Sequence, residues 1–196
     1  MRHTIKMDQK DDRYYISKVL EGDMQAFSYL VDKYKDMVFT LAFRILKNRE
    51  NAEEVAQDSF VKVYQNIKKF KSKSKFSTWL YRIVYNTAIS RVRVKQKPTM
   101  SIDEQNYFEI EDEKQNVIKN FDIENNKMIL QRLLNKLDES DRALITLYYL
   151  DECKISEIAE ITGQNNSNIK VKLHRTRKKM KEELHRILKS EMVEII

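Results

Sequence analysis

The sequence predicts an all-α protein built from two small helical domains joined by an acidic flexible linker. Glycine occurs twice and proline once in 196 residues, whereas tight hairpins and phosphate-binding loops both need glycine. Apolar residues recur at spacings of three and four in two separate regions, and the acidic stretch between these regions has no helical period. All-β folds, P-loops and dinucleotide-binding folds are therefore disfavoured.

The first periodic region predicts a short helix over residues 12–20 and a long helix over 23–47. Gly22 and Asp23 give the long helix its start, and Asn48 gives it a stop. The next helix is expected over 51–67, because Asn51 followed by Glu54 resembles a capping box.

Serine and lysine repeats over residues 68–75 predict a loop. A further helix is expected from near Ser77 to just before Pro98, because proline cannot continue a helix. Residues 1–98 should thus form one N-terminal domain, and residues 99–126 the acidic linker.

The second domain is expected over residues 127–196. Its apolar period predicts helices near 123–137 and 143–150, then a short helix over 155–162 that Gly163 ends. The last helix begins near Ser167 and carries no acidic residue before Glu182. A short helix, a turn with glycine and a longer basic helix together predict a helix-turn-helix unit; the alternative is a solvated basic helix.

The charge balance indicates an anionic partner. Lysine and arginine number 37 against 30 acids, which gives a net charge of +7. Nucleic acid is favoured over a membrane surface because no strongly apolar helix face stands apart. The first residues lack the apolar core of a signal peptide, and no run approaches the roughly 18 apolar residues of a membrane span. We therefore expect a cytoplasmic protein without membrane insertion, in which the single Cys153 is a small buried or half-buried residue.

Residues 59–102 contain no acid but many cations interleaved with aromatic rings. Cations neutralise phosphates and exposed rings stack on unpaired bases, so this tract predicts binding to single-stranded nucleic acid. Rings at helical spacing are also commonly core residues, and the sequence leaves both interpretations open for each ring, including Trp79.

Catalysis has little support in the sequence. His3, His174 and His185 show no spacing typical of a metal site, and a helical protein with 30 acids has pairs of carboxylates by chance. We expect neither a metal nor a cofactor, and no enzymatic activity.

Three strings then carry a resemblance to a known family: NAEEVAQDSFVKVYQNI, KFSTWLYRIVYNTAISRVR and ISEIAEITGQNNSNIKVKLHRTRKKM. In this order and separation they resemble the extracytoplasmic-function (ECF) group of the bacterial sigma-70 family of RNA polymerase initiation factors. The likeness covers about residues 26–94 and 130–184. It implies a region 2-like domain, a region 4-like helix-turn-helix domain, and a linker that passes near the polymerase active site and RNA exit.

The resemblance also implies partners and roles. Core RNA polymerase would be bound through the clamp helices of its largest subunit and the flap of its second-largest subunit. Promoter DNA would be bound as duplex and as the non-template single strand. The residues that match the polymerase-binding face are Glu53, Glu54, Gln57 and Asp58. Ordinary helix solvation, with acids favoured in the first turn, accounts adequately for Glu53 and Glu54 and less well for Asp58.

Two further sets of residues match DNA-binding positions of the family. Those for the minus-ten element and its single strand are Lys69, Phe70, Lys71, Lys73, Lys75, Phe76, Trp79, Arg82, Asn86, Arg91 and Arg93. For the duplex minus-thirty-five element, Lys170, Val171, His174 and Arg175 match family positions that face DNA. The first turns of a recognition helix meet base edges, which independently favours Lys170, Lys172, His174 and Arg175. The full predicted set also includes Ser167, Asn168 and Lys178. Val171 departs from the small polar residue often found at its position in the family.

Two other functions compete with a sigma factor. A free-standing helix-turn-helix regulator would account for residues 167–181 but not for the aromatic tract or the acidic face. An RNA-binding enzyme or nuclease would need metal-binding carboxylates that the pattern does not show. The sequence leaves open the promoter, the activating signal, an anti-sigma factor or other recruiter, and the relative placement of the two domains.

Overall fold

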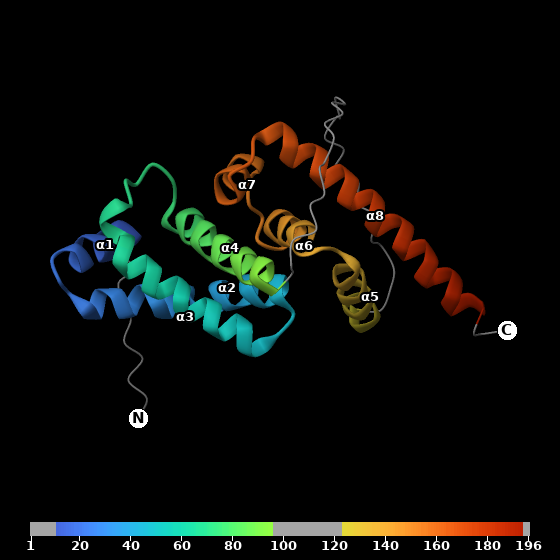
Figure 1. The fold of residues 1–196 in the computed structure, drawn as a ribbon, viewed down its shortest axis with the longest axis horizontal. Coiled ribbons are helices and arrows are strands. Elements are labelled where there is room, and N and C mark those ends of the chain that lie inside the picture. The colour runs from blue at the N-terminus through green and yellow to red at the C-terminus, as the bar shows by residue number, and fades with distance from the viewer. Residues whose placement is uncertain (1–10, 96–122, 194–196) are drawn as a thin grey trace.

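The protein is all-helical in its computed structural model, which describes residues 11–95 and 123–193. In the N-terminal half, four α-helices pack around one another and a short 3-10 turn, η1 (Ile67–Lys69), follows α3 (Figure 1). Their bounds are α1 (Asp12–Leu20), α2 (Met24–Leu46), α3 (Arg49–Asn66) and α4 (Phe76–Lys95).

The C-terminal half contains the predicted helix-turn-helix unit. Its helices are α5 (Ile123–Lys136), α6 (Glu139–Ile145), the π-helical turn η2 (Thr146–Leu150), α7 (Ile155–Thr162) and α8 (Asn166–Val193). Gly163 ends α7 with a positive φ of 73°, a left-handed conformation that glycine adopts without strain. Most of the predicted linker over 99–126 lies outside the described residues.

Side-chain caps set two helix starts in the N-terminal half. The Asp23 carboxylate accepts hydrogen bonds from the amides of Gln25 and Ala26, at 2.8 and 3.1 Å, so α2 begins where the sequence predicts. The predicted start of α3 is wrong by about one turn. Asn48 is not the stop of α2 but the N-cap of α3, because its side chain accepts a hydrogen bond from the Asn51 amide at 2.8 Å.

A single cluster of buried apolar residues runs through both halves of the molecule. α4 packs against α7, and α6 packs against α2 and α4. Figure 1 shows α6 and α7 lying beside the ends of α2 and α4, while α8 extends away from the N-terminal half. The two halves are therefore held in a closed arrangement. The sequence did not predict this relative placement of the two domains.

Arg142 connects the two halves through hydrogen bonds. Its side chain is only 4% exposed and donates to the carbonyl oxygens of Ile45 and Arg44 at 2.8 and 3.1 Å. It also donates to those of Leu134 and Leu137, at 2.8 and 2.6 Å. Carbonyls in the last turn of a helix lack intrahelical partners, so one buried guanidinium satisfies the ends of both α2 and α5.

Candidate functional site

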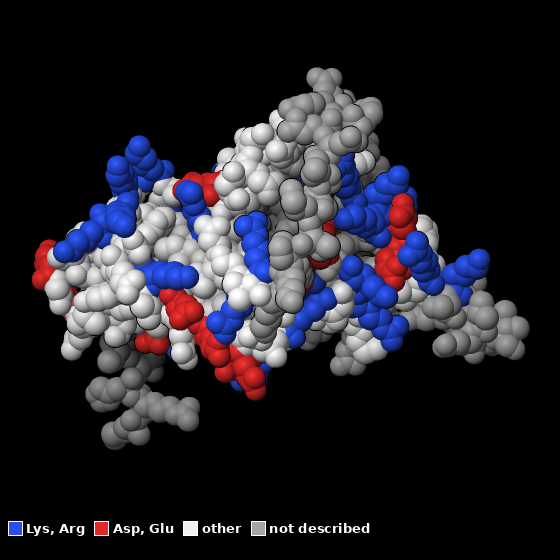
Figure 2. All heavy atoms as spheres, in the orientation of Figure 1, with Lys and Arg blue, Asp and Glu red and all other residues white. Residues whose placement is uncertain are grey.

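The outer face of α3 carries the four predicted polymerase-binding residues. All four, Glu53, Glu54, Gln57 and Asp58, are exposed. The inner face of the same helix is buried through Ala52, Val55, Ser59 and Val63. Figure 2 shows acidic side chains running across the region of α3. The helical period thus turns the polar set outward as one surface, which we call the acidic face.

One contact joins the acidic face to the next helix. Glu54 forms an ion pair with Arg91 of α4, and Glu53 pairs with Arg49 of its own helix at 2.8 Å. Arg91 is assigned by resemblance to the DNA-binding set, yet its side chain points toward α3. Both pairs are largely exposed, where such pairs contribute about 0 to 1 kcal/mol.

A second surface runs along α4. Trp79, Arg82, Asn86 and Arg93 follow one another at intervals of three, four and seven residues, which places them on one side of a helix. Arg82, Asn86 and Arg93 are exposed and Trp79 is half-buried. We call this side the strand face.

The loop before α4 adds exposed cations to the strand face, but not all of its aromatic rings are exposed. Lys69, Lys71, Lys73 and Lys75 are all exposed. The ring of Phe76, in contrast, is 3% exposed and belongs to the core.

The half-buried ring of Phe70 lies over the buried ring of Phe76, with centroids 5.7 Å apart, and 5.3 Å from Trp79. Tyr81 and Tyr85 are also buried. Of the rings between residues 70 and 85, Phe70 and Trp79 therefore retain exposed surface beside the loop cations, and the buried ring of Phe76 packs against both.

α7 lies against the tip of this loop. The Lys75 ammonium is 3.0 Å from the Glu157 carboxylate, and the Ser74 hydroxyl donates to Glu160 at 2.7 Å. Burial alone would raise the pKa of Glu157, but the backbone N–H of Lys154 and the Lys75 ammonium outweigh it and lower that pKa. In the closed arrangement, α7 thus binds two residues at the tip of the cationic loop, Ser74 and Lys75.

A cavity of about 680 Å³ lies between this loop, α1 and α7. Its lining includes Asp12, Tyr34, Phe70, Lys73 and Glu160. The Tyr34 hydroxyl donates to Asp12 at 2.6 Å; burial, followed by this hydrogen bond to Asp12, raises the pKa of Tyr34. The cavity is mixed in charge, so it lacks the uniformly positive lining typical of a phosphate site.

The first turns of α8 present most of the predicted duplex-binding residues to solvent. Ser167, Asn168, Lys170, His174, Arg175 and Lys178 are exposed, and Val171 is half-buried. Lys172 differs from them, because its ammonium donates to the Ser140 hydroxyl at 2.6 Å and lies 3.6 Å from the Asp141 carboxylate. The structure therefore turns Lys172 toward α6 and away from the outer side of α8.

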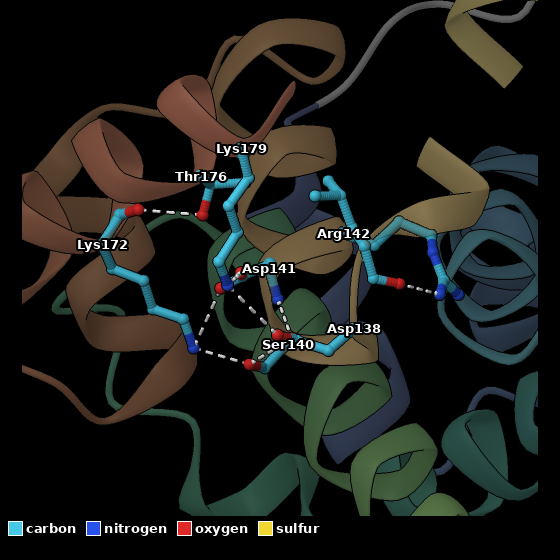
Figure 3. Close-up of polar contacts among 8 residues, drawn as sticks. Asp138, Ser140, Asp141, Arg142, Lys172, Thr176 and Lys179 are labelled. Carbon is cyan, nitrogen blue, oxygen red and sulfur yellow. Dashed lines mark hydrogen bonds and ion pairs between the residues drawn. The ribbon is translucent and has the colours of Figure 1, made fainter. Parts of the chain in front are cut away.

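The sequence did not predict the structural roles of two residues of this domain, Asp141 and Arg142. Asp141 is 3% exposed; it accepts a hydrogen bond from the Lys179 ammonium at 2.8 Å and forms an ion pair with Lys172 at 3.6 Å (Figure 3). Arg142, next to it, makes the contacts between the two halves described above. In the sequence the two residues follow the polar run 138–140 and precede an apolar run, which gives no signal of burial; only their distant partners show that they are buried.

Among the described residues, no group of three or more histidines, cysteines or acids lies close enough to hold a metal ion. The helices that the structure describes include none long and apolar enough to span a membrane.

Comparisons with known proteins agree with this geometry. The family model for sigma-70 region 2 matches residues 30–97, which contain the acidic face and the strand face. The model for sigma-70 region 4 matches residues 127–180, which contain the helix-turn-helix unit.

Relatives extend this similarity over nearly the whole chain. The ECF RNA polymerase sigma factor SigW of Bacillus subtilis is 34% identical over 86% of this chain and 94% of its own length. The ECF RNA polymerase sigma-E factor of Haemophilus influenzae is 28% identical over 92% of this chain and 99% of its own.

Two solved structures share the fold. CnrH, solved in complex with the cytosolic domain of CnrY, has a TM-score of 0.63 at 21% identity and covers 89% of this chain and 97% of its own. The sigma factor RpoE of Bartonella quintana, solved with the anti-sigma factor NepR, has a TM-score of 0.59 at 20% identity, over 84% of this chain and 99% of its own. By its two matched regions and its similarity to full-length relatives, the chain belongs to the ECF group of the sigma-70 family of RNA polymerase sigma factors.

Proposed function

We propose that this chain binds core RNA polymerase, directs it to specific promoters and helps to melt the minus-ten region. The acidic face of α3 contacts the polymerase clamp helices, the strand face of α4 with its loop captures the non-template strand, and α8 reads the minus-thirty-five element. In this role the chain supplies recognition in the cytoplasm, and the polymerase supplies all of the catalysis.

The observation that carries this proposal is the pair of oppositely charged surfaces on neighbouring helices. The acidic face of α3 would repel the phosphates that the strand face of α4 attracts. Two different partners therefore suit the two surfaces: a basic protein for α3 and a nucleic acid for α4. A free-standing DNA-binding regulator would leave the acidic face without a role.

Capture of a single strand requires both charge and exposed ring surface. Unstacking a base costs a few kcal/mol, and stacking on an aromatic ring returns about 1–3 kcal/mol per base. Phe70 and Trp79 supply that surface beside four exposed loop lysines and the cations of α4. We assign the strand to this side of the molecule, with Arg82 and Arg93 holding phosphates and Asn86 close to a base.

Transcription with purified components tests the proposal directly. Core polymerase, this chain and a library of promoter fragments should give abortive and run-off products from specific start sites that disappear without the chain. Trp79→Ala should impair melting more than initial binding, whereas Arg175→Ala should impair initial binding. Tight duplex binding by the chain alone, without initiation by polymerase, would move the assignment to a free-standing regulator.

The polymerase surface has its own test. Replacing Glu54, Gln57 and Asp58 together by alanine should weaken core binding at least about tenfold, since the polar groups that would contact the polymerase are lost. Alanine fits the helix, and the exposed Glu54–Arg91 pair that is also lost contributes at most about 1 kcal/mol to stability. A matched control replaces Glu21, in the turn after α1, and Glu182, on α8; both are exposed acids outside α3, and their loss should leave core binding unchanged. Equal affinity of the triple variant and the wild type, with both folded by circular dichroism, contradicts the assignment.

A further inference from the structure

The outer side of α8 can be defined from its buried side. Ile169, Leu173 and Thr176 are at most 2% exposed and pack inward. At 100° per residue, the opposite side of the helix is centred on Val171 and Lys178, with His174 and Arg175 beside them. In a helix-turn-helix unit, this side of the second helix enters the major groove, and its first turns contact base edges.

The structure reduces the number of α8 side chains that can contact bases on this side. Lys172 and Lys179 lie on one flank and are both held by the buried carboxylate of Asp141 (Figure 3). Lys179 also lies 3.9 Å from Asp138. Two cations of the helix are thereby directed to α6, so the centre of the outer side is less crowded by charge than the sequence indicates.

Val171 is the apolar side chain at this centre. Its neighbours on the outer side are polar or charged, and β-branched valine is a poorer helix former than alanine by several tenths of a kcal/mol. Its isopropyl group neither donates nor accepts hydrogen bonds. The apolar group that base pairs present in the major groove is the C5-methyl of thymine, and small apolar side chains contact it.

We propose that Val171 contacts the C5-methyl of one thymine in the minus-thirty-five element and so determines the base at that position. This inference rests on the proposed function, because it requires α8 to lie in the major groove. The exposed side chains beside Val171 then contact the adjacent base pairs or phosphates, with Arg175 suited to guanine and Asn168 to adenine. Specificity at the Val171 position thus depends on a methyl group and not on a hydrogen bond.

Deoxyuridine substitution tests this inference, because it removes only the methyl group from thymine. A duplex that the holoenzyme selects from a random library is first resynthesised with deoxyuridine at each upstream thymine in turn. At one position, the substitution should weaken holoenzyme binding about fourfold, as expected for the loss of one buried methyl group. Adding a 5-methyl group to a cytosine placed at that position should restore part of the affinity.

Two variants of α8 separate methyl recognition from general affinity. Val171→Ser should bind thymine and deoxyuridine duplexes equally at that position. Lys178 lies on the same side of α8 but beyond the first turns, which contact base edges, so we expect it to contact a phosphate. Lys178→Ala should therefore weaken binding to both duplexes alike and leave their ratio unchanged, since a phosphate contact carries no sequence information.

Two results would overturn the inference while leaving the sigma-factor role intact. One is equal binding of thymine and deoxyuridine duplexes at every position. The other is a deoxyuridine effect that persists in Val171→Ser. If Arg175→Ala, Lys178→Ala and Val171→Ser all bind the upstream element as the wild type does, then α8 does not read DNA, and that part of the proposed function fails with the inference.

Discussion

At the scale of single residues, the environment of Cys153 shows how the closed arrangement changes side-chain chemistry. Burial raises the pKa of the Cys153 thiol to about 12, with smaller contributions from the Asp151 and Glu157 carboxylates. The thiolate is the reactive form of cysteine. Cys153 is therefore a half-buried, unreactive thiol, which agrees with the position predicted from the sequence.

Alkylation of the single cysteine measures this effect. Because the pKa rises from 9.0 to about 12, thiolates at pH 8 are about a thousandfold rarer than in the unfolded chain. We expect iodoacetamide to label the native chain at least about 100-fold more slowly than the chain in denaturant, followed by mass spectrometry. Similar labelling rates in the two states would show that the thiol is accessible and ionises normally.

At the scale of elements, the helices begin at N-caps whose donor and acceptor are only a few residues apart in the sequence. Asp138 caps α6 by accepting from the Asp141 amide at 2.7 Å. Burial alone would raise the pKa of Asp138, but the Asp141 amide, the Ser140 hydroxyl and the Lys172 ammonium outweigh it and lower that pKa. α6 in turn carries Arg142, so this cap supports the contact between the two halves.

Removing the cap should destabilise the protein in a pH-dependent manner. Asp138→Ala should lower the free energy of unfolding by about 1 kcal/mol at pH 7, measured by urea unfolding. The ionised carboxylate stabilises the fold above its ordinary pKa of 3.8, and this contribution is lost as the pH falls through the lowered folded-state pKa. The difference between variant and wild type should therefore shrink in acid.

The control for this change is Asp36→Ala, which removes an exposed carboxylate within α2. It should shift stability by less than about 0.5 kcal/mol at any pH. An Asp138→Ala cost that does not depend on pH would contradict the role of the ionised carboxylate.

At the scale of the whole molecule, Arg142 holds the N-terminal and C-terminal halves together. It binds four backbone carbonyls, two of them about 100 positions away in sequence. Arg142→Ala would leave buried carbonyls unpaired, at about 1–3 kcal/mol for each that water cannot reach. We expect a loss of about 2–4 kcal/mol in unfolding free energy, a larger radius of gyration by X-ray scattering, and faster labelling of Cys153.

Arg186→Ala is the matched control for Arg142→Ala. Arg186 pairs with Glu183 on the exposed side of α8, and its loss should change none of these three measurements appreciably. If Arg142→Ala keeps the radius of gyration and the slow Cys153 labelling of the wild type, then apolar packing alone holds the two halves together.

The contact of α7 with the loop links the closed arrangement to DNA binding. Glu157→Gln keeps an oxygen that can accept the Lys154 amide, which the wild-type carboxylate binds at 2.8 Å, but removes the charge that holds Lys75. The free chain should then bind a single-stranded oligonucleotide about two- to fivefold more tightly at low salt, measured by fluorescence anisotropy. Glu152→Gln, at an exposed position, should have no such effect; equal gains in both variants would indicate a general charge effect.

The sequence by itself determined the features that depend on neighbours within about one or two helical turns. The outward acidic face of α3, the loop before α4, the turn at Gly163 and the exposed cations of α8 follow from residue period and local backbone preference. The start of α3 was missed because Asn48 and Asn51 are both competent caps, and only the fold selects one of them.

Only the tertiary structure decided which of these residues stay exposed to solvent and which contact the rest of the protein. Phe76 enters the core, Lys172 turns to Asp141, and Arg91 turns to Glu54. The closed placement of the two halves, with Arg142 at its centre, depends on acceptors far along the chain. Helical period fixes the direction of a side chain on its own helix, but the free energy of its contacts depends on what long-range packing brings opposite it.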